Sequence, residues 1–444
     1  MHRVFVHCVM CESRTPAVAV TWLQRHHRLD LTAAKDQVRR PWRGPGWAWS
    51  VPDDALVRRT RRRRGAARLT GRPADRSRLA LALVSGSASP SVSPSPRPDT
   101  MAAAVYQSPG VVTVERRAVP PPGPGQILVA VHNCGICGSD IHQLRDGWGL
   151  KAGAVAGHEW AGTIVALGEG VDTWSIGEQV VGGPSPRCGM CRRCVEGKPS
   201  QCENRPVDIT DWPDGAFAEY ILVAAAGVLR LPEGLSARHA ALAEPLAVAL
   251  HGITRSGIAA GDTAMVIGAG PIGALSVVAL QAMGVTDVTV VEPNEGRKQL
   301  ARSLGATAVL DPSDLDLFPM WEPERLSGRA VHVVLECSGR KEAIEAGFNQ
   351  LGRGGVLVMV GAGIEAPSFD PNRMILNELS VCGSFVYDQG GFERAIELLA
   401  SGNIPGELLI DTTDVPLSGL GDALEALAPG RIAGKVMVVP EVRH

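Results

Sequence analysis

A glycine-rich turn between an apolar strand and a helix constrains the fold of this chain more than any other feature of its sequence. The strand-like run Ala264–Ile267 leads directly into three glycines with the spacing G-x-G-x-x-G, and a helical stretch begins within the turn. The first glycine permits the tight turn, the second allows close backbone approach to a pyrophosphate, and the third allows the helix to pack on the strand. The turn therefore predicts a dinucleotide site at a helix start, with cofactor contacts from Gly268, Gly270, Pro271, Ile272 and Gly273.

An acidic residue at the end of the next predicted strand bears on the choice of cofactor. Glu292 follows the turn by about 20 positions, where a carboxylate would hydrogen-bond the adenosine ribose hydroxyls. A carboxylate there would repel the 2′-phosphate of NADP, so we expect NAD to be preferred. Two alternatives stay open: Glu292 is a solvated residue at a strand end, or Arg297, five positions later, accepts that phosphate.

The chain divides into segments with different patterns. From Met101 to about Tyr220, short Val/Ile-rich strands such as Gln126–Val131 and Gly162–Val165 alternate with Gly/Pro turns, which predicts a β-rich domain. After Glu244, apolar strands alternate with longer helical stretches, which predicts an α/β domain with a parallel sheet and helices on both faces. These stretches are Ala264–Ile267, Pro271–Met283, Val288–Val291, Glu295–Leu304, Val331–Glu336, Lys341–Leu351 and Val356–Val360.

We therefore expect four segments. Residues 1–100 form an extension, 101–247 the β-rich domain, 248–385 the dinucleotide-binding domain, and 386–444 a return to the β-rich domain. The last segment holds one amphipathic helix, Gly391–Ala400, and a final Val/Met strand.

The extension has a composition that does not support a packed core. It includes Arg61–Arg64 and the run Ser85–Pro98, which consists almost wholly of Ser, Pro, Ala, Gly and Val, so we expect disorder. The amino-acid composition changes at Met101, where an apolar strand-like run begins. Three interpretations stay open: translation from a spurious upstream start, a genuine disordered basic tail, or a targeting peptide.

The net charge of −2 is distributed unevenly. Residues 1–100 hold 19 Lys and Arg against 7 Asp and Glu, whereas residues 101–444 hold 25 against 39, a net charge of −14. A cysteine knuckle with an Arg-rich arm is typical of some nucleic-acid binders, but an acidic folded part opposes the phosphate contacts that such binding needs. Nucleic acid is therefore excluded as a partner.

Nothing in the sequence indicates a membrane or secreted protein. No stretch approaches the roughly 18 consecutive apolar residues of a spanning helix, and the residues after Met1 lack an apolar signal core. Cysteines two residues apart beside a nucleotide-binding pattern favour metal ligation over disulfides, which suits a reducing compartment. We expect a cytoplasmic protein with no membrane partner.

Four cysteines within fifteen residues predict a closed metal site. Four thiolates can complete a tetrahedral Zn²⁺ site with no open position, which makes the metal structural. An iron–sulfur cluster is less compatible, because the ferredoxin run places its fourth cysteine after three residues and before proline, whereas Cys202 follows after seven and precedes Glu203. Unligated thiols are the remaining alternative. The predicted ligands are Cys188, Cys191, Cys194 and Cys202.

A closed site performs no chemistry, so a second centre is needed, and two short segments offer its ligands. They are the run from Cys134 to His142 and the triplet Gly157-His158-Glu159, with Glu244-Pro245 at the domain junction. These segments, with the cysteine cluster and the glycine turn, resemble the zinc-containing medium-chain dehydrogenases, especially the polyol, butanediol and threonine dehydrogenase branch. The resemblance extends from Met101 to about Val439. It implies a GroES-like catalytic domain, a Rossmann domain, an active site between them, and a homodimer or homotetramer.

The resemblance also implies roles for single residues. Cys137 and His158 would be the thiolate and imidazole ligands of a catalytic zinc, whereas Cys134 would be a core cysteine. The third ligand stays open between Glu159 and Glu244, and we favour Glu159 directly and Glu244 through water or exchange. Further implied roles are support of the ligand histidine by Asp140, acceptance of the hydroxyl proton by Ser139, and its relay through the cofactor ribose to His142.

The implied activity is a zinc-dependent, NAD-linked and reversible oxidation of a small secondary alcohol, diol or polyol to the ketone, with two zinc ions per chain. Glu178 stands where the resembling motif usually has Asp, and Ser139 where many threonine dehydrogenases have Thr. The serine at position 139 makes L-threonine a less favoured substrate than a diol or polyol. An L-threonine 3-dehydrogenase or a zinc-free reductase of the same fold is the alternative.

Overall fold

The computed structural model describes residues 98–184, 187–205 and 214–440. The N-terminal extension, with its predicted disorder and its three interpretations, lies outside these residues except for its last three positions. None of the helices in the described part has the length and apolar content needed to cross a membrane.

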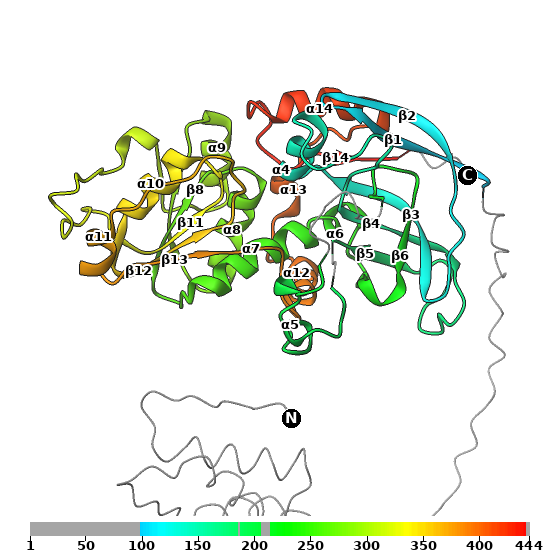
Figure 1. Cartoon of the computed structure of the whole chain (residues 1–444), viewed down its shortest axis with the longest axis horizontal. Helices are drawn as coiled ribbons and strands as arrows, with labels where there is room; N and C mark the ends of the chain where they lie inside the picture. The colour runs from blue at the N-terminus through cyan, green and yellow to red at the C-terminus, as the bar shows by residue number, and fades with distance from the viewer. Residues whose placement is uncertain (1–97, 185–186, 206–213, 441–444) are drawn as a thin grey trace, which may run out of the picture. The chain divides into compact units, whose positions relative to one another are not determined.

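A β-hairpin and an antiparallel sheet form the first part of the described chain (Figure 1). The sheet has the order β14-β3-β4-β5-β7, in which β14 is Met437–Val438, and β6 also pairs with β3. Its core contains side chains from β3 and β4 that are fully buried, such as Val129 and Ile164. The strands are β1 (Thr100–Ser108), β2 (Val111–Ala118), β3 (Gln126–Gly135), β4 (Glu159–Leu167), β5 (Gln179–Gly182), β6 (Tyr220–Ala224) and β7 (Val228–Arg230).

A parallel sheet of six strands forms the second part, in the order β10-β9-β8-β11-β12-β13. This is the doubly wound order in which the two halves diverge between the first and fourth strands. The strands are β8 (Thr263–Ile267), β9 (Asp287–Val291), β10 (Ala308–Leu310), β11 (Val331–Glu336), β12 (Leu351–Met359) and β13 (Ser380–Gly383). The helices between them are α8 (Pro271–Ala282), α9 (Glu295–Ser303), α10 (Lys341–Asn349) and α11 (Pro371–Leu376). The predicted pairing of a β-rich domain with a Rossmann sheet is therefore confirmed.

The predicted elements of the parallel sheet agree closely with the observed ones. Strand β11 has the predicted bounds, and so does helix α12 (Gly391–Ala400). Strand β13 was not predicted, because its sequence Ser-Val-Cys-Gly is short and its side chains are not continuously apolar. Among the described strands it pairs only with β12, at the edge of the sheet, so burial does not demand a fully apolar strand there.

Helix α7 (Ala243–Ser256) connects the two parts and runs through the predicted boundary at 247/248. Most of its residues are buried, because it packs against α8 of the parallel sheet and against α12. Short helices α6 (Ala237–Ala240), α13 (Gly406–Leu409) and α14 (Leu420–Leu427) complete the described α-helices outside the cysteine-rich loop and the segment after β3, and three 3-10 turns lie at Ala225–Gly227, Pro312–Asp314 and Leu417–Gly419.

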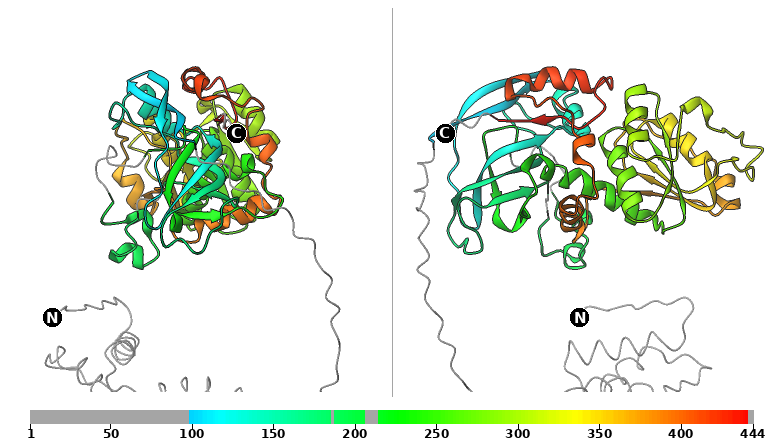
Figure 2. Two further views of the ribbon diagram at one scale, coloured as in Figure 1. Left: turned by 90° about the vertical axis from the view of Figure 1, so that its right-hand side faces the viewer. Right: turned by 180° about the vertical axis from the view of Figure 1, so that it is seen from behind.

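The C-terminal segment returns to the antiparallel sheet. Strand β14 (Met437–Val438) pairs antiparallel with β3, with Met437 opposite Gly135 and Val438 opposite Cys134. In Figure 2 the red C-terminal segment accordingly lies beside the cyan strands. The last strand of the described chain therefore ends next to the segment that carries Cys137.

Candidate metal centres and cofactor site

One candidate metal centre lies where β3 and β4 end side by side. Cys137 caps the short helix α4 (Gly138–Asp140), which follows β3 after two residues, and Glu159 begins β4. The strand register places Gly135 opposite Glu159, so the two segments meet at this end of the sheet. Ligand atoms of Cys137, His158 and Glu159 all lie within 4.8 Å of one another.

Asp140 supports both non-carboxylate members of this cluster. It is fully buried, and its Oδ2 accepts a hydrogen bond of 2.8 Å from the backbone N–H of Cys137. Its Oδ1 lies 3.6 Å from His158 Nδ1 and accepts no hydrogen bond from the described residues. Burial lowers the pKa of His158, but the charges of Asp140 and Cys137 raise it by more, so the pKa is well above its usual value. A metal cation bound beside His158 would be stabilised by the same negative charges of Asp140 and Cys137.

Glu159 is held by a lysine that sequence reasoning did not identify. Lys435 Nζ lies 2.7 Å from Glu159 Oε1 and 2.6 Å from Oε2, and it also donates a 3.0 Å hydrogen bond to the carbonyl of Ile136. Both charged side chains are buried, with 2% and 0% of their surface exposed. Burial lowers the pKa of Lys435, but Glu159 and Cys137 raise it by more, so the lysine keeps its charge.

Glu244 belongs to the electrostatic surroundings of the cluster rather than to its closest group. It lies in the first turn of α7, is 3% exposed, and is not among the atoms within 4.8 Å of one another. Burial raises the pKa of Glu244 to about 7, with opposing contributions from His158 and Glu159. Its Cγ lies against Gly183, where any side chain would collide with it and with the Tyr387 hydroxyl.

The residues of this cluster suit a metal ion. Thiolate, imidazole and carboxylate are the three ligand types that zinc uses, and three protein ligands leave a position for substrate. Glu159 Oε2 is buried and accepts no hydrogen bond of adequate geometry from the described residues, despite its proximity to Lys435. A buried carboxylate oxygen without a hydrogen bond is costly unless a cation completes its environment.

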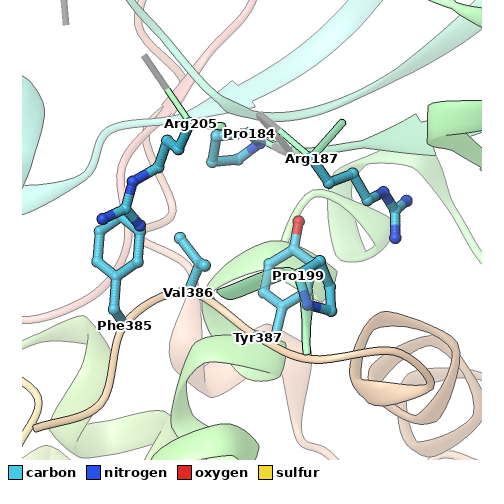
Figure 3. Close-up of a pocket in the computed structure, with 7 residues that line it drawn as sticks. All are labelled: Pro184, Arg187, Pro199, Arg205, Phe385, Val386 and Tyr387. Carbon is cyan, nitrogen blue, oxygen red and sulfur yellow. The ribbon is translucent and has the colours of Figure 1, made fainter. Parts of the chain in front are cut away.

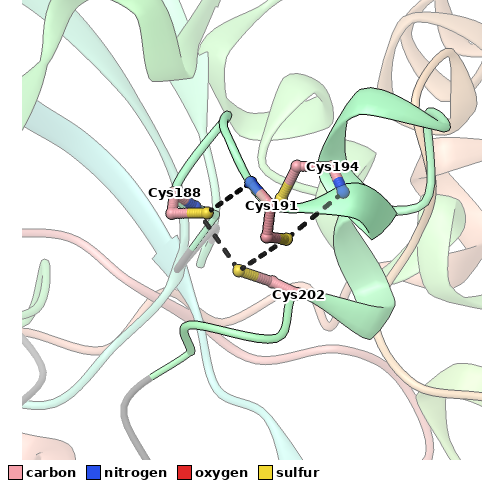
Figure 4. Close-up of side chains that lie close together, drawn as sticks. All are labelled: Cys188, Cys191, Cys194 and Cys202. Carbon is pink, nitrogen blue, oxygen red and sulfur yellow. Dashed lines mark hydrogen bonds between the residues drawn. The ribbon is translucent and has the colours of Figure 1, made fainter. Parts of the chain in front are cut away.

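The second candidate centre is the loop that carries the four predicted cysteines (Figure 4). All four sulfur atoms lie within 4.8 Å of one another. Backbone N–H groups point at the sulfurs, from Cys191 to Cys188 Sγ at 3.2 Å and from Cys194 to Cys191 Sγ at 3.5 Å. Hydrogen bonds from the Met190 and Cys191 backbone lower the pKa of Cys188 to about 6, which favours the thiolate. The helix α5 (Arg192–Val195) starts inside the loop.

Ser139 and His142 follow Cys137 on α4 and on the helical turn Ile141–Arg145. No hydrogen bond joins these two described side chains, so a relay between them requires an intervening group. His142 Nδ1 lies 3.1 Å from Asp146 Oδ2, and its ring lies 5.2 Å from that of Trp148. Both neighbours were missed by sequence reasoning, because loop residues carry no pattern that marks them.

The glycine turn has the geometry that its spacing predicts. Gly268 has φ +87°, and a Cβ at Gly273 would collide with the Gly268 carbonyl, so only glycine fits there. Gly270 caps α8 and has Pro271 and Ile272 as the first helical residues. A Cβ at Gly270 would have no neighbour closer than the Arg297 guanidinium at 4.0 Å, which leaves the backbone open to a ligand.

Glu292 lies beside the turn and is 4% exposed. Its Oε2 accepts a 2.7 Å hydrogen bond from the Ala269 N–H, and its Oε1 accepts one of 2.9 Å from the Asn294 N–H. Arg297 packs against Gly430 of the C-terminal segment, and its buried Nε has no hydrogen-bond partner among the described residues. The structure thus brings all of the predicted cofactor residues to one end of the parallel sheet.

Lys435 and Tyr387 are the main site residues that sequence reasoning missed. Lys435 lies two positions before β14, directly before the apolar run Val436–Val439, and a charge next to a buried strand pattern is a signal that could have identified it. Tyr387 follows the unpredicted strand β13 in a segment without periodicity, so nothing in the sequence distinguished it.

Comparison with known proteins agrees with this arrangement. Residues 123–233 match the family model of the alcohol dehydrogenase GroES-like domain, and residues 271–401 match that of the zinc-binding dehydrogenases. The sorbitol dehydrogenase of Bacillus subtilis is 32% identical over 351 residues, which are 77% of this chain and 98% of that protein. The 2-dehydro-3-deoxy-L-galactonate 5-dehydrogenase of Pseudoalteromonas atlantica is 36% identical over 312 residues, 70% and 90% respectively.

A solved structure has the same fold. The crystal structure of 2R,3R-butanediol dehydrogenase from Bacillus subtilis superposes with a TM-score of 0.67 at 30% identity, and the match covers 77% of this chain and all of that one.

Proposed function

Because this chain belongs to the zinc-containing medium-chain alcohol dehydrogenase family, we propose that it oxidises a secondary alcohol of a diol or polyol to the ketone, reversibly and with NAD. The observation that carries this proposal is the buried cluster of thiolate, imidazole and carboxylate beside a dinucleotide turn. The names of the relatives, sorbitol and butanediol dehydrogenase, support the substrate class.

Cys137, His158 and Glu159 would hold the catalytic zinc, and Glu244, whose pKa responds to the charges of His158 and Glu159, would act through water or by exchange with Glu159 as the carboxylate ligand. Zinc supplies Lewis acidity, which lowers the pKa of bound water from 15.7 to about 7 and acts on a bound alcohol in the same direction. Asp140 fixes the orientation of His158, and Lys435 holds Glu159 in place. The four cysteines of the loop would hold a second, structural zinc.

Ser139 would accept the hydroxyl proton of the substrate at Oγ. His142 is partly exposed, with 36% of its side chain accessible, so it can pass a proton to solvent. Its Nδ1 faces Asp146, which leaves Nε2 for the cofactor ribose that would connect it to Ser139. Hydride transfer requires loss of this proton, and the relay would carry it from the substrate to solvent.

The turn from Gly268 to Gly273 would bind the pyrophosphate of NAD at the start of α8. The backbone N–H groups of Ala269 and Asn294 fix the Glu292 carboxylate, and each of its oxygens keeps a further acceptor position for a ribose hydroxyl. Arg297 would contribute at the phosphate side of the same site. A 2′-phosphate beside Glu292 would meet a buried negative charge, so NAD is preferred over NADP.

We propose a homodimer or homotetramer in the cytoplasm. Strand β13 forms an edge of the parallel sheet, and α11 exposes Ile375 and Leu376 directly before it. An open strand edge next to exposed apolar side chains supports pairing with a second copy. None of the eight cysteines of the described part forms a disulfide, which supports a reducing compartment.

The test is a substrate panel with the purified full-length chain. Secondary alcohols, 2,3-butanediol, hexitols and L-threonine are supplied with NAD or NADP, and the reduced cofactor is followed by its absorbance. We expect oxidation of diols or polyols, higher kcat/KM with NAD, and two zinc ions per chain by metal analysis. No turnover of any alcohol, or one zinc or none per chain, would contradict the proposal.

A further inference from the structure

Ser139 and Tyr387 carry hydroxyl groups near the Cys137 cluster, but they differ in their access to solvent. The Tyr387 hydroxyl lies beside Glu244 at Gly183 and points into a small pocket (Figure 3). Burial and the charge of Glu244 raise the pKa of Tyr387 well above its usual value, so this hydroxyl keeps its proton. Ser139 instead lies on α4, which leads directly into the turn that carries the partly exposed His142. The path of a proton to solvent is therefore better provided on the His142 side.

His142 forms a pair with Asp146 at the end of this turn. The two residues are four positions apart, and His142 Nδ1 lies 3.1 Å from Asp146 Oδ2. The turn, Ile141–Arg145, is π-helical, a rare geometry that occurs mostly at functional sites, and Asp146 caps it. The local backbone thus brings the carboxylate to one nitrogen of the imidazole.

The carboxylate determines which nitrogen of His142 carries the proton. The hydrogen bond from His142 is the main cause that lowers the pKa of Asp146, so Asp146 is ionised at neutral pH. An ionised carboxylate accepts hydrogen bonds and donates none, so Nδ1 must be the donor. A neutral imidazole has a single N–H group, which leaves Nε2 of His142 as a proton acceptor.

The neighbouring residues hold both members of the pair in place. Arg145 Nε donates a 3.0 Å hydrogen bond to the other carboxylate oxygen, Asp146 Oδ1. The ring of Trp148 lies 5.2 Å from that of His142, and its backbone N–H donates to the His142 carbonyl at 3.0 Å. Gly147 makes this return possible, because it has φ +79° and an added Cβ would lie 2.7 Å from the nearest side chain.

Other charged groups do not compete for this pair. Asp140 on α4 lies 3.6 Å from His158 and supports that ring instead. Strand β2 and helix α14 also pack against the turn. Within the described ranges, their charged side chains form no hydrogen bond or ion pair with His142 or Asp146; these are Glu115, Arg116, Arg117, Asp422 and Glu425.

We propose that Asp146 is a positioning residue of the proton relay, which holds His142 in the form with Nδ1 protonated so that Nε2 can accept the proton that leaves the substrate. The inference rests on the proposed dehydrogenase function and adds a residue to its mechanism.

The proton balance of the relay follows from this arrangement. As Ser139 Oγ takes the proton of the substrate hydroxyl, it gives its own proton to the cofactor ribose, and His142 Nε2 receives one from the ribose hydroxyl. His142 is then an imidazolium whose Nδ1–H still faces the Asp146 carboxylate, which stabilises the charge. It returns to the neutral form when Nε2 loses the proton to water. The opposite tautomer has a proton on Nε2 and cannot accept another.

The first test measures the tautomer without any turnover. The full-length zinc protein is labelled with ¹⁵N-histidine, and the His142 signals are assigned by their loss in His142→Gln. At neutral pH and without cofactor, we expect ¹⁵N NMR to show a protonated Nδ1 and an unprotonated Nε2. Asp146→Asn should invert this pattern. Arg145 donates to Oδ1, so the amide oxygen would face Arg145 and the amide NH₂ would donate to Nδ1.

The second test compares variants by the single-turnover rate of NADH formation from 2,3-butanediol. Asp146→Asn should lower this rate by about tenfold or more, a part of the effect of a general base. Asp146→Ala should lower it by only about two- to fivefold, because both tautomers are then populated. A purely structural role predicts the reverse order, since Asn is the closer replacement in shape. Adding Arg145→Ala to Asp146→Asn lets the amide turn round and should restore the rate to that of Asp146→Ala.

Two controls separate this role from a general loss of structure. The Kd of NADH, measured by its fluorescence, should stay within about twofold in all Asp146 variants, because the glycine turn is unaltered. Glu397→Gln removes another exposed ion pair, 3.4 Å from Arg394 on α12, and should leave the rate within about twofold.

Two results would overturn the inference and leave the dehydrogenase intact. One is a protonated Nε2 on neutral His142 in the unaltered chain, and the other is an Asp146→Asn variant at least as fast as Asp146→Ala. Failure of the unaltered enzyme to oxidise any alcohol would overturn both proposals.

Discussion

The two candidate metal centres differ in how the chain builds them. The cysteine loop draws four identical ligands from fifteen consecutive residues and positions them with its own backbone N–H groups. The Cys137 cluster combines three ligand types from two segments, and its surroundings include Asp140, Glu244 and Lys435. One centre is a local feature of the chain, whereas the other exists only when the whole domain is folded.

This difference teaches what each centre is suited to do. Four thiolates close the coordination of a zinc ion and leave no place for a reactant. The Cys137 cluster has a buried Glu159 oxygen without a hydrogen bond, so it depends on a bound cation. Its three protein ligands leave one coordination position open to a substrate. The following predictions test this contrast, in order of decreasing effect.

Replacement of Cys137 by Ala should remove catalysis and leave the fold intact. Loss of a ligand should lower kcat/KM by more than about 100-fold, the upper range for residues that merely support ligands. Zinc content should fall by one ion per chain, measured by metal analysis beside the rate. Cys382→Ser is the control, because Cys382 lies at the edge strand away from the cluster. Unchanged oxidation in Cys137→Ala would remove the distinction between the two centres.

Replacement of Lys435 by Met should destabilise the protein by about 3–5 kcal/mol, since it leaves the buried Glu159 charge without its partner. Chemical denaturation of the metal-free chain measures this free energy of unfolding. Adding Glu159→Gln to Lys435→Met should restore a large part of the lost stability, because the uncompensated charge is removed. If the double variant is as unstable as the single one, the pair does not support the cluster.

Replacement of Cys194 by Ser should act on stability and leave the chemistry largely unchanged. Loss of one loop ligand, at a cost of about 1–2 kcal/mol, would lower Tm by about 1–3 °C in a chain of this size, measured by thermal unfolding with zinc present. The turnover number at 25 °C should stay within about threefold of the original, since Cys194 is remote from the reacting atoms. A loss of kcat as large as that of Cys137→Ala would make the two centres equivalent.

The smallest effect concerns His251 on α7, whose Nδ1 lies 4.0 Å from Asp388 Oδ2. Burial lowers the pKa of His251, with Asp388 opposing and Arg255 adding to the shift. The folded state therefore binds the proton less well than the unfolded state, so this contribution to stability is present above about pH 6.5 and is lost as the pH falls. His251→Asn should reduce the loss of Tm between pH 7.5 and 5.5, by at most about 4 °C. An identical pH dependence in the variant would contradict the assignment.

The same contrast explains how much of the molecule could be predicted from its sequence. The cysteine spacing and the glycine turn are local, and the structure assembles both as their spacing predicts. Val331–Glu336 and Gly391–Ala400 were predicted with their observed bounds, because burial gives them continuous periodic patterns.

Non-local features escaped prediction. Lys435 meets Glu159 only through the pairing of β14 with β3, and Tyr387 meets Glu244 only through the packing around Gly183. Resemblance to a family supplied Cys137, His158 and Glu159 as candidates, but the charges that surround them depend on tertiary contacts. The domain boundary at 247/248 stays a prediction, and helix α7, most of whose residues are buried, runs through that position.

The pairing of Lys435 with Glu159 has a consequence for protein synthesis. The two residues are 276 positions apart, which at about 5–20 residues per second separates their translation by roughly 15–55 s. During that interval the nascent chain carries Cys137, His158 and Glu159 without the cation that neutralises the carboxylate. A polypeptide that ends before residue 435 therefore contains all three ligands but no complete active centre. Its antiparallel sheet lacks β14, which leaves the edge of β3 accessible to cellular proteases.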